Sequence, residues 1–179
     1  FLHLKFDDTV KSDSEKPQII IDFNGKHKIY SADCYVIYHQ SAGKKNSIVE
    51  VKYENELAKD RENLTNKFER ARASLQKIDM DFLLFTDATY PEIYIRNLDF
   101  LYRYKVFTHQ SDNSARILNG LCRPMPALEL ANSIAHNKSD YLHVCNSIWS
   151  LVAYGYLDAD LMNEEVTMNS VIWINNERH

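Results

Sequence analysis

The hydrophobic pattern of the first hundred residues predicts four strands. Gln18–Phe23 is a short apolar run that ends at an Asn-Gly pair, a strong signal for a hairpin turn. Lys28–His39 is rich in Tyr, Val and Ile, as its partner strand would be. Ser47–Tyr53 predicts a third strand, and the continuous apolar run Asp81–Thr86 predicts a buried fourth strand.

A helix from about Asp60 to Gln76 is predicted between the third strand and the fourth. Its apolar residues recur at helical spacing along one face; they are Leu64, Phe68, Ala71, Leu75 and Ile78. A strand, helix, strand order needs a crossover connection, so we expect an α/β domain with a mixed sheet and flanking helices. Val49 and Val51 are expected to face the side of this sheet on which the helix packs.

After about residue 108 the pattern predicts helices in place of strands. Thr108–Asn113 is a polar linker, which suggests two domains, residues 1–107 and residues 108–179. Three short helices are predicted at Ser114–Leu121, Pro126–Ala135 and Ser139–Tyr154, with Ser139 as a helix N-cap. Val166–Met168 and Ser170–Ile174 predict a terminal hairpin. Three helices and a hairpin make a small helical domain of winged-helix-like arrangement.

Composition places the chain among ordinary globular proteins. It has 179 residues, of which 45% are hydrophobic and 26% charged, so a disordered chain is excluded. No apolar run approaches the ~20 residues that span a bilayer, so we expect no contact with a membrane. The three cysteines lie far apart, which argues against a disulfide scaffold and fits a reducing cytoplasm.

Charge is slightly negative overall and uneven along the chain. The net charge is -4, so tight autonomous binding to nucleic acid is not implied. Eight Lys or Arg residues nevertheless lie between Lys44 and Arg72, whereas residues 105–179 hold 5 basic and 8 acidic residues, a net charge of -3. The basic stretch would suit guided contact with DNA, and a solvated helix face is the alternative that charge alone favours.

The candidate chemistry lies at Asp33, Glu50 and Lys52. Glu50 and Lys52 are two residues apart on a predicted strand, so their side chains leave the same face of the sheet. Antiparallel pairing with the preceding strand would bring Asp33 close to Glu50, and hard oxygen ligands of this kind suit Mg²⁺, or Mn²⁺ as a substitute. We therefore expect Asp33, Glu50 and Lys52 to be catalytic and Asp33, Glu50 and Val51 to hold the metal. A cross-strand charge pair on an exposed strand is the alternative.

An Asp followed by Glu-x-Lys on the next strand is the pattern of PD-(D/E)xK nucleases, although Ala32 stands where that motif has Pro. Over nearly its whole length the chain also resembles TnsA, the endonuclease subunit of heteromeric cut-and-paste transposases. The segments that carry this resemblance are Phe1–Asp7 with Glu15–Pro17, Ser31–Asp33, Ile48–Lys52, Arg96–Tyr104, Tyr154–Leu161 and Val166–Val171.

The resemblance implies a restriction-endonuclease-like fold and a Mg²⁺-dependent DNA endonuclease of the bacterial cytoplasm. It implies cutting at the 5′ ends of transposon-end DNA, while a partner transposase subunit cuts and joins the 3′ ends. It also implies contact with a AAA+ regulator ATPase through the C-terminal domain, and the acidity of residues 105–179 agrees with a protein partner there. The family takes a further Glu from a helix that is expected to lie upstream of Phe1.

Two other functions remain open at this point. One is a stand-alone PD-(D/E)xK nuclease of restriction or repair, which would cut without a partner. The other is a non-catalytic assembly module of a transposase, in which the nuclease fold is only a scaffold. Intact Asp33, Glu50 and Lys52 argue against the assembly module, and the missing upstream Glu argues for it.

Overall fold

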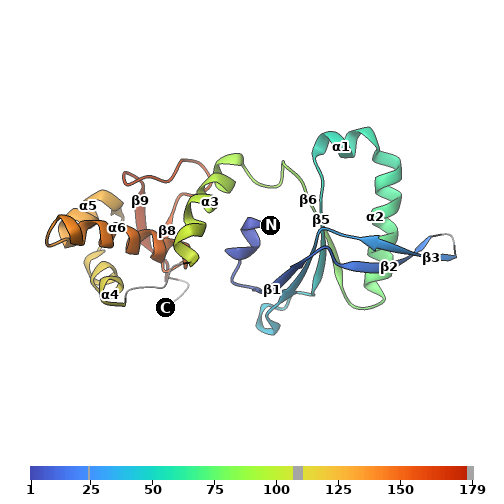
Figure 1. Cartoon of the computed structure of the whole chain (residues 1–179), viewed down its shortest axis with the longest axis horizontal. Coiled ribbons are helices and arrows are strands. Elements are labelled where there is room, and N and C mark those ends of the chain that lie inside the picture. The colour runs from blue at the N-terminus through green and yellow to red at the C-terminus, as the bar shows by residue number, and fades with distance from the viewer. Residues whose placement is uncertain (24, 107–110, 177–179) are drawn as a thin grey trace. The chain divides into compact units, whose positions relative to one another are not determined.

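The computed structural model describes residues 1–23, 25–106 and 111–176, which fall into two compact units, His3–Pro91 and Glu92–His179 (Figure 1). Helix α3 (Glu92–Val106) therefore belongs to the second unit, whereas the sequence analysis placed the boundary at residue 107. The reason is that α3 packs on α6 (Lys138–Ala153): the rings of Phe100 and Trp149 lie 5.6 Å apart.

A four-stranded sheet forms the centre of the first unit. Its strands are β1 (Val10–Glu15), β4 (Cys34–Tyr38), β5 (Ser47–Val51) and β6 (Asp81–Phe85), in the order β1-β4-β5-β6. β4 pairs antiparallel with both β1 and β5, while β5 and β6 are parallel. The predicted mixed sheet is therefore confirmed. Its crossover contains the short helix α1 (Glu54–Lys59), which the sequence analysis missed, and the expected helix, α2 (Arg61–Gln76).

The predicted hairpin is present as a separate two-stranded sheet. It consists of β2 (Gln18–Phe23) and β3 (Lys26–Ser31). The prediction of one strand over Lys28–His39 was wrong, because the chain leaves β3 at Ala32 and Asp33 and then enters the central sheet as β4. β3 pairs with β2, whereas β4 pairs with β1 and β5, so one straight strand could not serve both sheets.

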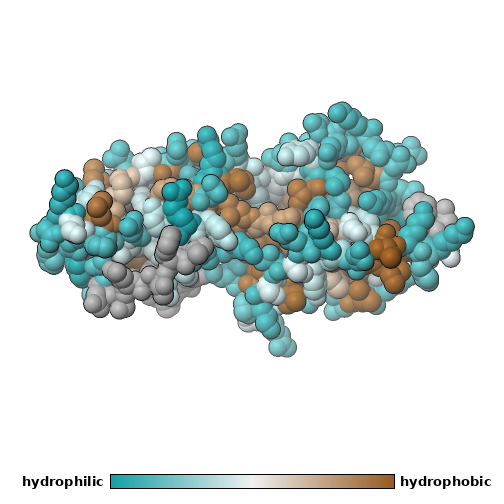
Figure 2. All heavy atoms as spheres, viewed as in Figure 1, coloured by the Kyte–Doolittle hydropathy of each residue, from teal (hydrophilic) through white to brown (hydrophobic). Residues whose placement is uncertain are grey.

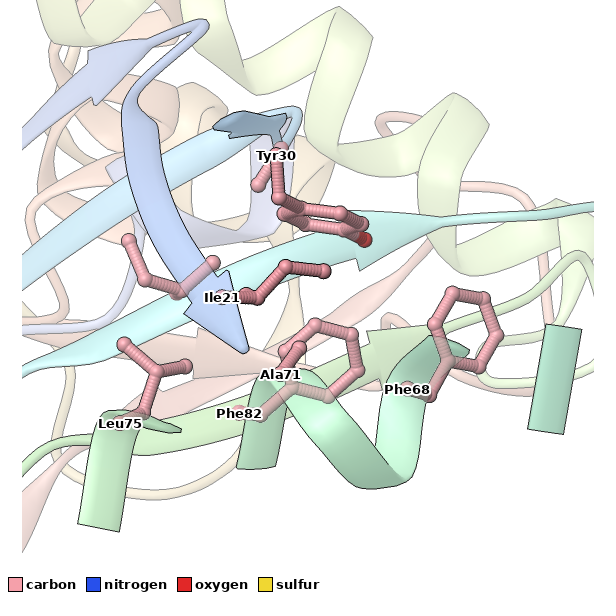
Figure 3. Close-up of a cluster of buried hydrophobic side chains, with 8 residues drawn as sticks. Ile21, Tyr30, Phe68, Ala71, Leu75 and Phe82 are labelled. Atoms are coloured by element: carbon pink, nitrogen blue, oxygen red, sulfur yellow. The ribbon is translucent and has the colours of Figure 1, made fainter. Parts of the chain in front are cut away.

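The main hydrophobic core of the first unit lies between the hairpin, α2 and β6. Figure 3 shows Ile21 and Tyr30 of the hairpin beside Phe82 of β6 and Phe68, Ala71 and Leu75 of α2. Ile48 belongs to this core, whereas Val49 packs with Leu4, Cys34 and Val36 in a second cluster. The expectation that Val49 and Val51 face the helix was therefore wrong. Strand alternation puts Ile48 and Glu50 on the α2 side, and Val51 is 40% exposed.

The second unit combines four helices with a small sheet. After α3 come α4 (Ser111–Gly120), β7 (Met125–Pro126), α5 (Ala127–Ile134), α6, β8 (Leu157–Ala159) and β9 (Val171–Ile174). The sheet has the order β7-β9-β8 and is antiparallel. The three predicted helices are confirmed, but the hairpin partner of β9 is β8 and not Val166–Met168. The N-cap of α6 is Asn137 and not Ser139, because its side chain accepts the backbone N–H groups of Ser139 and Asp140.

A buried polar network and a partly exposed ion pair hold the second unit together. Asn97 of α3 is 2% exposed, and its amide nitrogen donates to the carbonyl oxygens of Leu161 and Glu164 at 2.9 and 2.7 Å. Its amide oxygen accepts from the backbone N–H of Val166 at 3.0 Å. Arg116 of α4 donates to Asp140 at the start of α6. No helix within the described parts of the chain is long and apolar enough to cross a membrane.

Candidate active site

The pairing of β4 with β5 places Asp33 opposite Glu50. Cys34 is the register partner of Val49, and one step beyond that pair the backbone N–H of Asp33 donates to the carbonyl oxygen of Val49 at 3.1 Å. The carboxylate of Asp33 accepts the backbone N–H of Val51 at 2.8 Å. Because Cys34 and Val49 face the second cluster, Asp33 and Glu50 lie on the α2 side of the sheet. The sequence analysis expected this juxtaposition from antiparallel pairing.

Glu50 is a buried carboxylate with two partners. It is 3% exposed, and its Oε2 accepts the hydroxyl of Tyr30 at 2.7 Å. Its Oε1 lies 2.9 Å from Nζ of Lys52. A buried polar group is costly unless it is paired and hydrogen-bonded, so these two contacts offset the burial of the Glu50 side chain.

Lys52 lies at the end of β5 beside Glu50. Its Nζ also donates to the carbonyl oxygen of Val51 at 3.1 Å. Burial lowers the pKa of Lys52, but the hydrogen bond and charge of Glu50, with the charges of Asp33 and Glu56, outweigh burial and raise it. The side chain is therefore a cation at neutral pH. Its ammonium group therefore places hydrogen-bond donors and a positive charge at the end of β5, where the two carboxylates also lie.

Tyr30 is a residue of this site that the sequence analysis did not single out. It comes from β3, is 3% exposed, and contacts Glu50 across the gap between the hairpin and the central sheet. Burial raises the pKa of Tyr30, and the hydrogen bond to Glu50 and the charges of Glu50 and Asp33 raise it further. Nζ of Lys67 on α2 lies 4.5 Å from the centre of the Tyr30 ring. The phenol therefore remains a hydrogen-bond donor to Glu50.

The oxygen atoms that this site offers as metal ligands fit a hard divalent cation in part. Asp33 and Glu50 offer carboxylate oxygens, and Val51 offers only its main-chain carbonyl, since a valine side chain has no donor atom. Within residues 1–23, 25–106 and 111–176, no group of three or more His, Cys, Asp and Glu side chains could hold a metal ion. Mg²⁺ is commonly held by one or two carboxylates together with substrate phosphates, so two carboxylates and a carbonyl suit that mode of binding.

The arrangement suits hydrolysis of a phosphodiester. Two carboxylates, a carbonyl and a lysine meet at the end of β5, and the helix α2 on the same side of the sheet carries Arg61, Lys67, Arg70 and Arg72. Positive charge at such a place stabilises the charge that develops on a phosphate in the transition state.

Comparison with known proteins identifies this part of the chain. Residues 7–87 match the family model described as "TnsA-like endonuclease N terminal". The match includes Asp33, Glu50 and Lys52 and ends before α3 begins. No curated protein matches the chain. The resemblance to TnsA that the sequence carries is thereby confirmed for the first unit, whose residues 7–87 match a TnsA-like endonuclease N-terminal domain.

Proposed function

We propose that this chain is the Mg²⁺-dependent endonuclease subunit of a heteromeric cut-and-paste transposase and that it cuts the 5′ ends of transposon DNA. The observation that carries the proposal is the pairing of β4 with β5, which puts Asp33 opposite Glu50 with Lys52 beside them. The match to the TnsA-like endonuclease domain over residues 7–87 supports a DNA substrate and a transposase partner.

In this proposal each site residue has its own role. Asp33, Glu50 and the carbonyl of Val51 hold Mg²⁺ or Mn²⁺, and when bound the ion supplies Lewis-acid stabilisation of charge on the scissile phosphate. Lys52 places a positive charge beside that phosphate and orients the attacking water. Tyr30 fixes the rotamer of Glu50 through the bond to Oε2 and leaves Oε1 toward Lys52.

The second unit supports a role in assembly. We propose that it is a winged-helix-like domain, because its elements follow the order α4-β7-α5-α6-β8-β9 and its small sheet ends in the β8–β9 hairpin. Its partner in the proposal is the AAA+ regulator ATPase. Residues 105–179 carry 5 basic and 8 acidic residues, and a segment with few cations can neutralise few DNA phosphates.

A non-catalytic assembly module is the second candidate function. The observation that favours it is the lack of a group of three acidic, His or Cys ligands in the part of the chain that the structure describes. In that case the Glu50–Lys52 ion pair would serve only to stabilise the buried end of β5.

Strand cleavage distinguishes these functions. Nicking of transposon-end DNA is measured with the chain, its partner transposase and the ATPase, in Mg²⁺ or Mn²⁺. Asp33→Ala is expected to abolish nicking, while Asp99→Ala, which removes an exposed carboxylate of α3, keeps it. Undiminished nicking by Asp33→Ala would refute the assignment of the site. Nicking by the chain without partners would instead favour a stand-alone nuclease.

A further inference from the structure

A cleft of about 470 Å³ opens on the same side of the sheet as Glu50. Leu84 of β6 forms part of its lining, and Leu84 is the register partner of Glu50. α1 contributes Leu57, and α2 contributes Arg61, Leu64 and Arg72. Figure 2 shows hydrophilic residues over α1 and α2 with a small hydrophobic area among them. The cleft therefore has an apolar floor and a basic rim, next to the candidate catalytic carboxylate.

The two arginines of the rim lie on one stripe of α2. Arg61, Thr65 and Arg72 are separated by four and seven residues, which is the spacing of a single helix face. Eleven residues of helix separate the arginines by ~16 Å, which is the rise of roughly five base pairs of duplex DNA. Two cations at this separation can contact phosphates that lie several base pairs apart on the duplex, but not two successive phosphates of one strand.

The rim arginines are not used in ion pairs. Within the described residues neither Arg61 nor Arg72 has a carboxylate partner, and the guanidinium of Arg72 lies 5.3 Å from the centre of the Phe82 ring. Both side chains are exposed. Glu54 is the acidic residue of the cleft lining. The rim thus keeps a net positive charge that the fold itself does not neutralise.

Ring contacts connect this rim to the site. Phe82, beneath Arg72, lies 6.5 Å from the ring of Tyr30, and Tyr30 donates to Glu50. The ammonium group of Lys67 lies over the ring of Tyr30. Two cations of α2, Lys67 and Arg72, therefore lie over aromatic rings that lead to Glu50. Phosphate contacts supply most of the affinity of proteins for DNA, and arginine binds phosphate in a bidentate manner.

We propose that Arg61 and Arg72 bind the phosphodiester backbone of the DNA substrate beside the cleavage site. The proposal rests on the proposed nuclease function, because it names the surface over which that substrate runs. An apolar side chain of a protein partner is the other occupant that the floor of Leu57, Leu64 and Leu84 could accept, and the test separates the two.

Salt dependence of DNA binding tests the proposal. The full 179-residue chain is titrated into a short fluorescein-labelled duplex of random sequence, without divalent metal, and anisotropy is followed at a series of salt concentrations. Each phosphate contact contributes about 0.9 to the slope of log K against log salt. Arg61→Gln and Arg72→Gln are each expected to weaken binding and lower the slope by about 1, and the double variant by about 2.

Two matched variants separate phosphate contact from other effects. Arg70→Gln removes the same charge from another face of α2, where Arg70 donates to Asn66, and should keep the wild-type slope. The pair Arg61→Lys and Arg72→Lys should keep most of the slope, because lysine still binds phosphate as a point charge. Thermal melting confirms that each variant is folded, which is expected because both arginines are exposed.

Three results would overturn the proposal. They are a wild-type slope in the double glutamine variant, an equal loss in Arg70→Gln, and no binding by the unchanged chain at low salt. The first of these would favour a protein partner at the cleft. DNA binding is measured here without metal and without cleavage. A failure of the nicking test on Asp33→Ala therefore does not affect the outcome of the binding test, and a failure of the binding test does not affect the outcome of the nicking test.

Discussion

Both carboxylate oxygens of Glu50 have a partner, and the two partners are of different kinds. Tyr30 is a neutral donor from β3, and Lys52 is a cation from the end of β5. Losing either partner leaves a buried oxygen without its hydrogen bond, and such a loss costs about 1–3 kcal/mol in general. Stability and chemistry are therefore coupled at this residue, and a useful variant has to separate them.

Lys52→Ala is expected to lower nicking by about two orders of magnitude, as for one lost electrostatic donor. It should also lower the melting temperature, because Glu50 loses the cation that lies 2.9 Å from its Oε1. The double variant Lys52→Ala with Glu50→Gln removes the unpaired charge, so it should regain stability but not activity. Wild-type nicking by the single variant Lys52→Ala, despite its lower stability, would reduce Lys52 to a structural role. Nicking rates and thermal melting measure the two effects.

Tyr30→Phe is expected to raise the metal concentration that nicking needs and to lower stability by about 1–3 kcal/mol, the cost of an unsatisfied buried group. The change removes only the hydroxyl that donates to Glu50. Tyr35→Phe is the control, since the hydroxyl of Tyr35 accepts from Asn46 and does not reach the carboxylates. An unchanged metal requirement in Tyr30→Phe would show that the hydroxyl does not position Glu50.

At this scale the sequence predicts part of the site. Glu50 and Lys52 are two residues apart, and strand alternation alone puts them on one face. Asp33 follows from the antiparallel pairing of neighbouring strands. Tyr30 could not be found in this way, because it lies 20 residues from Glu50 and belongs to a different sheet. Its contact exists only after the hairpin has packed against the central sheet.

At the scale of elements, the short helix η1 (Leu2–Lys5) is attached to the first unit by an aromatic contact. The ring of His3 lies 4.7 Å from that of Phe85 and 4.9 Å from that of Tyr90. Its Nε2 is buried and is the one such side-chain atom without a hydrogen-bond partner in the described chain. Burial is the main reason that the pKa of His3 falls from 6.5 to about 4.

This shift predicts a dependence of stability on pH. Above pH 6.5 His3 is neutral in the folded and the unfolded chain. As the pH falls from 6.5 toward 4, the unfolded chain binds a proton that the folded chain does not, so stability falls. Urea unfolding at several pH values measures the change. His3→Phe keeps an aromatic ring and should lose this part of the slope. The same slope in both proteins would refute the assignment to His3.

The elements that the sequence did not predict share a physical cause. β1 reads VKSDSE, and most of its side chains are exposed because it is an edge strand with little to bury. α1 contains no buried residue, so its pattern shows no apolar face. The hairpin, α2 and β6 were predicted because each buries an apolar face in the same core. Pairing over long distances, as between β8 and β9, leaves no local signal.

At the scale of the whole molecule, charge divides unevenly. Residues 1–104 hold 16 basic and 17 acidic residues, and residues 105–179 hold 5 and 8. Asp140, on the helix α6, is already neutralised in part: the hydrogen bond from Arg116 comes first among the causes that lower its pKa to about 2. The remaining acidic surface of the second unit suits a basic protein partner better than DNA.

We therefore expect the second unit to bind the regulator ATPase more tightly than it binds DNA. Leu142 on α6 is 61% exposed, and Leu142→Asp should weaken binding of the full chain to the ATPase while duplex binding stays unchanged. Arg123→Gln, which affects only an exposed pair with Glu129, is the control. Isothermal titration with the ATPase and anisotropy with DNA give the two affinities. A loss of DNA affinity alone would make α6 a DNA-reading helix.

The hydrogen bonds of the Asn97 amide determine where this chain could be joined to a segment of a related protein in a chimaera. Asn97 holds the backbone of Leu161, Glu164 and Val166 from within α3. A chimaera joined after residue 107 would pair a foreign α3 with this loop and leave three backbone groups unsatisfied unless the donor chain also supplied an Asn. A junction between Pro91 and Glu92 transfers the asparagine together with the groups that it binds. Gene fusions and domain swaps are therefore expected to succeed when the junction lies before the first residue of α3.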